Sequence, residues 1–144
     1  MDKKVFEAAM KALMVEDYIK VSRYDVTREE LVTYIIAKNG LVGAFLEGDN
    51  VYNFQTIGVL NKDAYPKLLK FIQELSYYDD NRKTYISFEY RDYKDRFEYH
   101  ISDESFERFI ISLQDAINAG VNMIDMTEEE RAKKLRELAE DNKK

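Results

Sequence analysis

Apolar and polar residues alternate most regularly in two short segments, residues 84–91 and 96–101, which flank a four-residue stretch at 92–95. A period of two is typical of β-strands, because successive side chains point to opposite faces of a sheet. A turn at 92–95 creates three apolar cross-strand pairs: Tyr90 with Phe97, Phe88 with Tyr99 and Ile86 with Ile101. The pattern therefore predicts a β-hairpin with one continuous apolar face.

The other face of this predicted hairpin carries charged residues in neighbouring pairs of like sign. Arg91 lies beside Arg96, and Glu89 lies beside Glu98. Like charges directly opposite each other are unfavourable, but the diagonals join Glu89 to Arg96 and Arg91 to Glu98. His100, the single histidine of the chain, falls on the same face. We expect this face to be in contact with water.

After Ile101 the apolar period changes from two to three and four, which predicts an amphipathic helix over residues 103–119. Its apolar positions are Phe106, Phe109, Ile110, Leu113 and Ile117. Ser102 is the expected N-cap, because a serine side chain can accept a hydrogen bond from the free amides of the first turn. Ile101 and Phe106 then form a hydrophobic staple that folds the helix back over the hairpin.

Two further helices are predicted near the N-terminus. Residues 2–21 place Phe6, Ala9, Met10, Leu13 and Met14 along one side. The second helix begins at Thr27, because the segment Thr27-Arg28-Glu29-Glu30 has the spacing of a capping box. We expect it to end at Asn39-Gly40, with glycine as a left-handed C-cap.

The middle of the chain predicts a second hairpin followed by another helix. Residues 41–60 contain the turn-forming segment 47–50 between two apolar runs. The helix begins at Asp63 and has the apolar positions Tyr65, Leu68, Leu69, Ile72 and Leu75. Residues 121–126 fit either a short strand or an apolar connector. A second capping box, starting at Thr127, opens a charged helix with a narrow apolar stripe.

These elements predict an α+β fold. The preferred architecture is an antiparallel four-stranded sheet built from two hairpin-plus-helix units, 41–76 and 84–119, with N-terminal helices and a C-terminal helical tail. We expect one domain over 1–126 and a charged tail over 127–144. The alternative is a ferredoxin-like β-α-β-β-α-β core, which would use residues 51–60, 63–76, 84–91, 96–101, 103–119 and 121–126.

Composition narrows the classes of function. The chain is 45% hydrophobic and 35% charged and has no cysteine, which excludes disulfides and thiolate chemistry. No secretory signal or membrane-spanning run is visible, so we expect a cytoplasmic protein. The net charge of −6 arises between Glu74 and Met126, since the rest of the chain is balanced. This acidic part disfavours general nucleic-acid binding and suits a protein partner with a basic surface.

Catalysis has little support in the sequence. His100 would have to serve any Ser-His-Asp arrangement, but no nucleophile elbow supplies the serine. Glu98, His100 and Asp103 together could offer metal ligands, although a hydrogen-bonded strand histidine is the better interpretation. Glycine-rich phosphate loops are absent from the sequence. We therefore predict no enzyme, no metal and no cofactor.

Tyrosine is in excess, with 11 tyrosines and no tryptophan. Several tyrosines fall outside the predicted core and lie among carboxylates, as is typical of protein-binding faces. The expected partner-binding residues are Tyr77, Tyr78, Asp79, Asp80, Asp92, Tyr93 and Asp95. We expect a non-enzymatic binding protein that acts as an inhibitor or antagonist. A short, cysteine-free, tyrosine-rich α+β chain also resembles, in general character, accessory proteins of bacterial phages and mobile elements.

The alternative function is binding of a small nucleotide-like ligand through the cations Arg82, Arg91, Arg96, His100 and Arg108. A homodimer is expected, formed through the tail helix or through a free strand edge at 41–46 or 51–60.

Overall fold

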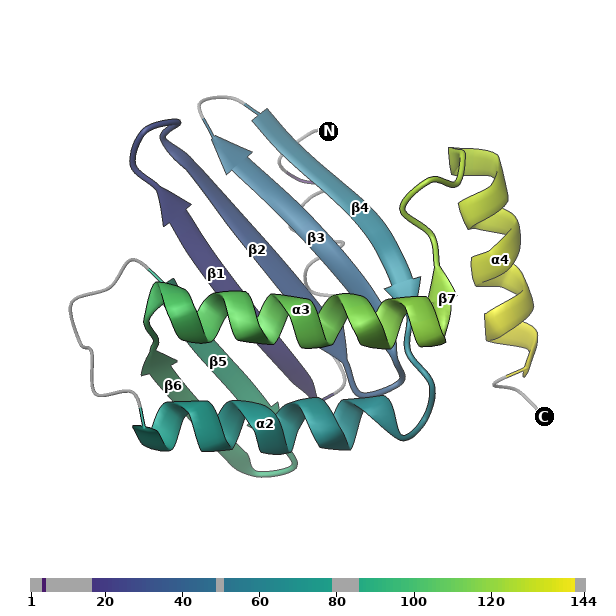
Figure 1. Cartoon of the computed structure of the whole chain (residues 1–144). Coiled ribbons are helices and arrows are strands. Elements are labelled where there is room, and N and C mark those ends of the chain that lie inside the picture. Colours follow the sequence, from purple (N-terminus) through teal and green to yellow (C-terminus); the bar gives the residue numbers. More distant parts are fainter. Residues whose placement is uncertain (1–3, 5–16, 49–50, 79–85, 142–144) are drawn as a thin grey trace.

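A computed structural model describes residues 4, 17–48, 51–78 and 86–141. Seven antiparallel strands form one sheet in the order β6-β5-β1-β2-β3-β4-β7. The strands are β1 (Tyr18–Asp25), β2 (Glu30–Ala37), β3 (Leu41–Gly48), β4 (Val51–Val59), β5 (Ile86–Asp92), β6 (Asp95–His100) and β7 (Val121–Asn122). The helices are α2 (Ala64–Tyr78), α3 (Asp103–Ala119) and α4 (Glu128–Asp141). Figure 1 shows α2 and α3 side by side across one face of the sheet.

The α+β class is confirmed, whereas the predicted four-stranded arrangement is wrong. Both hairpin-plus-helix units form, but β1 and β2 separate them, because β5 pairs with β1 and β3 pairs with β2. The ferredoxin-like order is not adopted either, since β1, β2 and β3 lie between β4 and β5. The segment predicted as a strand or connector at 121–126 contributes only the two residues of β7, which pair with the end of β4.

The β5–β6 hairpin has the predicted register. Phe88 is opposite Tyr99, Tyr90 is opposite Phe97, and the turn lies between Asp92 and Asp95. On the other face, the diagonal pair forms as expected, with Arg96 Nη2 2.7 Å from Glu89 Oε1. Arg91 Nε lies 3.8 Å from the Asp17 carboxylate. The second diagonal, from Arg91 to Glu98, stays a prediction.

The helix predicted to begin at Thr27 is wrong. Residues 30–37 form β2, and the Thr27 amide and hydroxyl donate to the Asp25 carboxylate at 3.0 and 2.7 Å within the β1–β2 turn. The run Val32-Thr33-Tyr34-Ile35-Ile36 is rich in β-branched and aromatic residues, which favour a strand. Gly40 does adopt the left-handed conformation, with φ of 100°, but it serves the β2–β3 turn.

The predicted helix over 2–21 is wrong at its C-terminal end, where Tyr18–Val21 belong to β1. The rest of that prediction falls, apart from Lys4 and Asp17, outside the described residues. At the other end of the chain, α4 confirms the predicted helical tail. Its capping box is formed by Thr127 and Glu130, whose side chains each accept the other's backbone amide at 3.2 and 3.4 Å. The boundary between a domain at 1–126 and a tail stays a prediction.

The main core lies between the sheet and the two helices. Ile19, Val21, Phe88 and Phe109 are among its fully buried side chains, and the rings of Phe88 and Phe109 meet edge to face with centroids 5.2 Å apart. The opposite face of the central strands is also buried. Its buried side chains include Tyr18, Ser22, Thr33, Ile35 and Phe45. The hydroxyl groups of Ser22 and Thr33 are hydrogen-bonded to each other, with 3.0 Å between their oxygens.

Candidate functional site

The helices α2 and α3 run in opposite directions across the sheet, so the first half of one lies beside the second half of the other (Figure 1). Each helix buries one stripe against the sheet: Tyr65, Leu68, Leu69, Ile72 and Leu75 in α2, and Phe106, Phe109, Leu113 and Ile117 in α3. Residues beside these stripes remain between the two helices on the outer surface. Phe71, half-buried near the middle of α2, is the largest apolar side chain among them.

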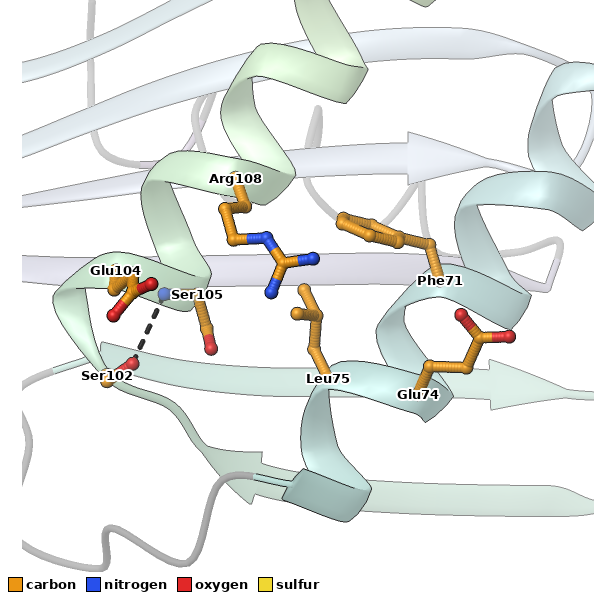
Figure 2. Close-up of a pocket in the computed structure, with 7 residues that line it drawn as sticks. All are labelled: Phe71, Glu74, Leu75, Ser102, Glu104, Ser105 and Arg108. Atoms are coloured by element: carbon orange, nitrogen blue, oxygen red, sulfur yellow. Dashed lines mark hydrogen bonds between the residues drawn. The ribbon is translucent and has the colours of Figure 1, made fainter.

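A first pocket, which we call the Arg108 pocket, lies between the second half of α2 and the start of α3. Its volume is about 420 Å³, and it is lined by Phe71, Glu74, Leu75, Ser102, Glu104, Ser105 and Arg108. Figure 2 shows the Arg108 side chain extending from α3 toward Phe71 and Leu75, with Glu74 and Glu104 on opposite sides. The Arg108 guanidinium carbon lies 5.7 Å from the centre of the Phe71 ring, which is within cation–π range.

The rim of the Arg108 pocket is fixed by the start of α3. The Ser102 side chain accepts a hydrogen bond from the Ser105 amide at 3.2 Å, as the N-cap prediction required (Figure 2). Asp103 and Glu104 then place carboxylates in the first turn of the helix, where the helix dipole favours negative charge. Glu104 therefore has a stable acidic position at the edge of the pocket.

A second pocket, the Lys67 pocket, continues along the other halves of the two helices. Its volume is about 560 Å³, and its lining residues are Asn61, Asp63, Ala64, Lys67, Leu68, Phe71, Ser112, Asp115, Ala116 and Ala119. Phe71 lines both pockets. We refer to the two pockets together as the interhelical groove.

The interhelical groove combines an apolar base with a ring of charge. Phe71, Leu68 and Leu75 supply apolar surface, and small residues such as Ala64 and Ala116 keep the groove open. Four carboxylates line it, those of Asp63, Glu74, Glu104 and Asp115, against the two cations Lys67 and Arg108. This arrangement can hold an apolar side chain while attracting positive charge around it.

The predicted partner-binding residues lie outside the groove. Tyr93 is 79% exposed in the β5–β6 turn with φ of 59°, and Lys94 Nζ lies 5.7 Å from its ring centre. Asp95 is exposed beside it. Asp92 ends β5, and Tyr77 and Tyr78 end α2, but their side chains lie outside the described parts. Asp79 and Asp80 lie wholly outside the described residues.

The structure does not bring the predicted ligand-binding cations together. Arg108 lies in the interhelical groove, whereas Arg91, Arg96 and His100 lie on the face of the sheet opposite the helices. Arg82 lies outside the described residues.

On that opposite face, a hydrogen-bonded network ties β5 and β6 to β1. The Tyr18 hydroxyl donates to the Glu89 carboxylate at 2.6 Å, and Arg96 donates to the same oxygen. Burial and the hydrogen bond to Glu89 together raise the pKa of Tyr18 to about 12. Burial opposes ionisation of Glu89, yet the hydrogen bonds from Tyr18 and Arg96 hold its pKa below the ordinary value. We interpret this network as structural, because each member is engaged by another.

The residues proposed as metal ligands are also placed. Glu98 and His100 are exposed on β6, and Asp103 lies 3.3 Å from Arg23 at the start of α3. Within the described residues, no group of three or more His, Asp or Glu side chains could hold a metal ion.

Among the helices of that same part of the chain, none has the length and apolar character that crossing a membrane requires. The cytoplasmic location stays a prediction.

Sequence analysis missed the interhelical groove. The sequence pattern that indicates the groove is a second stripe of polar and aromatic residues beside each apolar stripe. Its members are Lys67, Phe71 and Glu74 in α2, and Glu104, Arg108, Ser112 and Asp115 in α3. These spacings of three and four place the side chains on one flank of each helix. Only the packing of the helices beside each other makes the two flanks face each other.

Comparison with known protein families, curated proteins and solved structures finds no match for this chain.

Proposed function

We propose that this protein is a non-enzymatic binding protein whose interhelical groove holds a basic, amphipathic helix of another protein. The observation that supports the proposal is the combination of Phe71 at the centre of the groove with four carboxylates around it. A helix laid into a groove presents apolar anchors at spacings of three and four, and the groove offers apolar surface along two antiparallel helices. The partner's lysines and arginines would face Asp63, Glu74, Glu104 and Asp115.

The dimensions of the groove fit such a segment. α2 has 15 residues, which corresponds to a length of roughly 22 Å at 1.5 Å per residue. A partner helix of about four turns would span it. Its central apolar residue would pack against Phe71, and Arg108, which already lies over that ring, would accompany it at one side. A few well-packed, desolvated residues near the centre commonly supply most of the binding energy of an interface.

The acidic balance of the groove also supports the class of partner. Carboxylates around an apolar centre raise the association rate of basic partners and disfavour acidic ones, including nucleic acids. Engagement of a basic segment would block that segment from its other contacts, which is how the protein would act as an inhibitor or antagonist. The exposed Tyr93 turn lies outside the groove and would contact the partner only if the interface extended beyond it.

A random 16-residue peptide library displayed on phage tests this proposal. We expect peptides selected on the purified protein to be rich in lysine and arginine, with apolar residues three and four positions apart. Selected peptides are then measured by fluorescence anisotropy against Glu104→Lys, which reverses a groove charge. The matched control is Glu107→Lys, which changes the same charge on the same helix at an exposed residue outside the lining.

Glu104→Lys should raise the dissociation constant about tenfold or more, and higher salt should weaken binding to the wild type. Glu107→Lys should stay within about twofold of the wild type. Peptides without a basic excess, or equal losses in the two variants, would reject the groove as the binding site. Circular dichroism of each variant confirms that it is folded before binding is compared.

A further inference from the structure

β6 lies at one end of the strand order, with β5 as its neighbour in the sheet. The opposite end of the sheet is different, because the short β7 lies there and the loop after it is held by α4. Arg131 donates to the carbonyl oxygens of Met123 and Ile124 at 3.0 and 2.8 Å. An edge strand presents backbone donors and acceptors that can pair with another chain.

The register of the hairpin identifies which residues of β6 present these groups. Asp92 and Asp95 flank a two-residue turn, so these two residues form a hydrogen-bonded pair. Along β6 from Asp95, pairs with backbone hydrogen bonds to β5 then alternate with pairs without them. The Ile101 amide donates to the Ile86 carbonyl at 3.2 Å, which agrees with this alternation. The backbone groups of Arg96, Glu98 and His100 therefore point away from β5.

The charged side chains of β6 lie directly opposite like charges of β5 within one copy of the chain. Glu98 lies directly opposite Glu89, and Arg96 lies directly opposite Arg91. Arg96 reaches diagonally to Glu89, but like charges still face each other across both pairs. On the other side of the strand, Phe97 is 42% exposed, although its ring lies 5.2 Å from that of Tyr90.

We propose that β6 pairs with β6 of a second copy of this chain, antiparallel and about a two-fold axis at Phe97. In this register, Arg96 lies opposite the partner's Glu98, and Glu98 lies opposite the partner's Arg96. Both are pairs whose backbone groups point toward the partner, as an antiparallel ladder requires. Phe97 lies opposite the partner's Phe97 on the other face, at the close spacing of a pair without hydrogen bonds.

The neighbouring registers are worse for the same residues. Moving the axis one residue toward the turn places Arg96 opposite the partner's Arg96, and moving it one residue the other way places Glu98 opposite the partner's Glu98. Either move brings like charges together at the axis. The register at Phe97 also forms a row of four charged side chains across the four strands. Glu89 and Glu98 of one copy are followed by the partner's Arg96 and the partner's Arg91. The sheets of the two copies become continuous.

This interface differs from the edges expected from the sequence. Residues 41–46 belong to β3, which has a strand on each side, and β4 is paired with β3 and, at its end, with β7. The proposed dimer does not use the interhelical groove, so it stands or falls independently of the proposed function. Closed two-fold pairing also protects an edge that would otherwise invite aggregation.

Charge exchange tests the dimer by sedimentation velocity. Arg96→Glu places a glutamate opposite the partner's Glu98 in both of the symmetric pairs, so the dissociation constant should rise about tenfold or more. Glu98→Arg should do the same by opposing arginines. An equimolar mixture of these two variants should form a heterodimer with wild-type affinity, because each glutamate then faces an arginine. The matched control, Arg28→Glu in the distant β1–β2 turn, should dimerise like the wild type.

Recovery of dimerisation in the mixture would show that the single variants fail because of their charges in this register. Mixing could not restore dimerisation if the variants had failed to fold. Circular dichroism of each single variant provides the independent check on structure. A wild-type protein that sediments as a monomer at several hundred micromolar would overturn the proposal, as would single variants that dimerise normally. A dimer that persists in both variants and in their mixture would place the interface elsewhere on the molecule.

Discussion

Replacing Phe88 by alanine tests the central packing of the fold. The Phe88 side chain is fully buried in the middle of β5, opposite Val21 on one side and Tyr99 on the other. Its ring also meets Phe109 of α3 edge to face. Removing a buried phenylalanine costs about 3–5 kcal/mol, because the lost transfer free energy is joined by the cost of the remaining cavity. We expect the free energy of unfolding to fall by that amount.

The assay is urea unfolding followed by circular dichroism, with Phe88→Ala, Phe109→Ala and the double variant. Because the two rings touch and would share one cavity, the double variant should lose less than the sum of the single losses, by about 0.5–1.5 kcal/mol. Ile111→Ala is the control on α3, where the side chain is 59% exposed, and it should cost under about 1 kcal/mol. Losses below about 1 kcal/mol for both phenylalanines would refute the packing of α3 on this strand.

Two other predictions concern the backbone and the pH dependence. Gly40→Ala should destabilise the protein by about 1–3 kcal/mol in urea unfolding, because φ is 100° there and the added Cβ would lie 2.6 Å from the Leu60 carbonyl oxygen; unchanged stability would contradict this turn. The raised pKa of Tyr18, about 12 against an ordinary 10.0, predicts stability that is present below pH 10 and lost as the pH rises toward 12. Tyr18→Phe should therefore show a smaller loss of stability than the wild type between about pH 9 and 11.5, and equal losses would count against the buried hydrogen bond.

The β5–β6 hairpin and α3 were predictable because each has one apolar face packed in the core and one polar face that is at least partly exposed. Phe88 and Glu89 alternate cleanly, so the register follows from the pattern. Ser102 supplies the N-cap, and the apolar period changes immediately after Ile101. Local chemistry and tertiary packing agree over this whole segment, which is the condition for reading structure from sequence.

The strands β1 and β2 were not predictable from the same pattern. Ile35 and Ile36 are both fully buried although they point to opposite faces of the sheet. Strands buried on both faces lose the alternation and resemble buried helices. The capping-box sequence at Thr27 then favoured the wrong element. The β-branched residues of β2 were the signal that should have outweighed it.

The candidate site depended on pairings that span long stretches of the chain. The sequence contains the aromatic and acidic flanks of α2 and α3, but no local pattern in it predicts that the two helices pack beside each other. That arrangement follows from the pairing of β1 with β5, which brings the two hairpin-plus-helix units onto one sheet. The predicted tyrosine face was chosen by local composition, and Tyr93 lies in a turn that does not line the groove.

The central claim, that the interhelical groove binds a basic helix, is tested most directly by nuclear magnetic resonance. A selected basic peptide is added to isotope-labelled protein, and the amide shifts are followed in the wild type and in Glu104→Lys. We predict that the largest shifts cluster in α2 and α3 around Phe71, Glu74, Arg108 and Asp115, and that they disappear in the variant. Shifts concentrated on β6 or on the opposite face of the sheet, with the helices unaffected, would contradict the account.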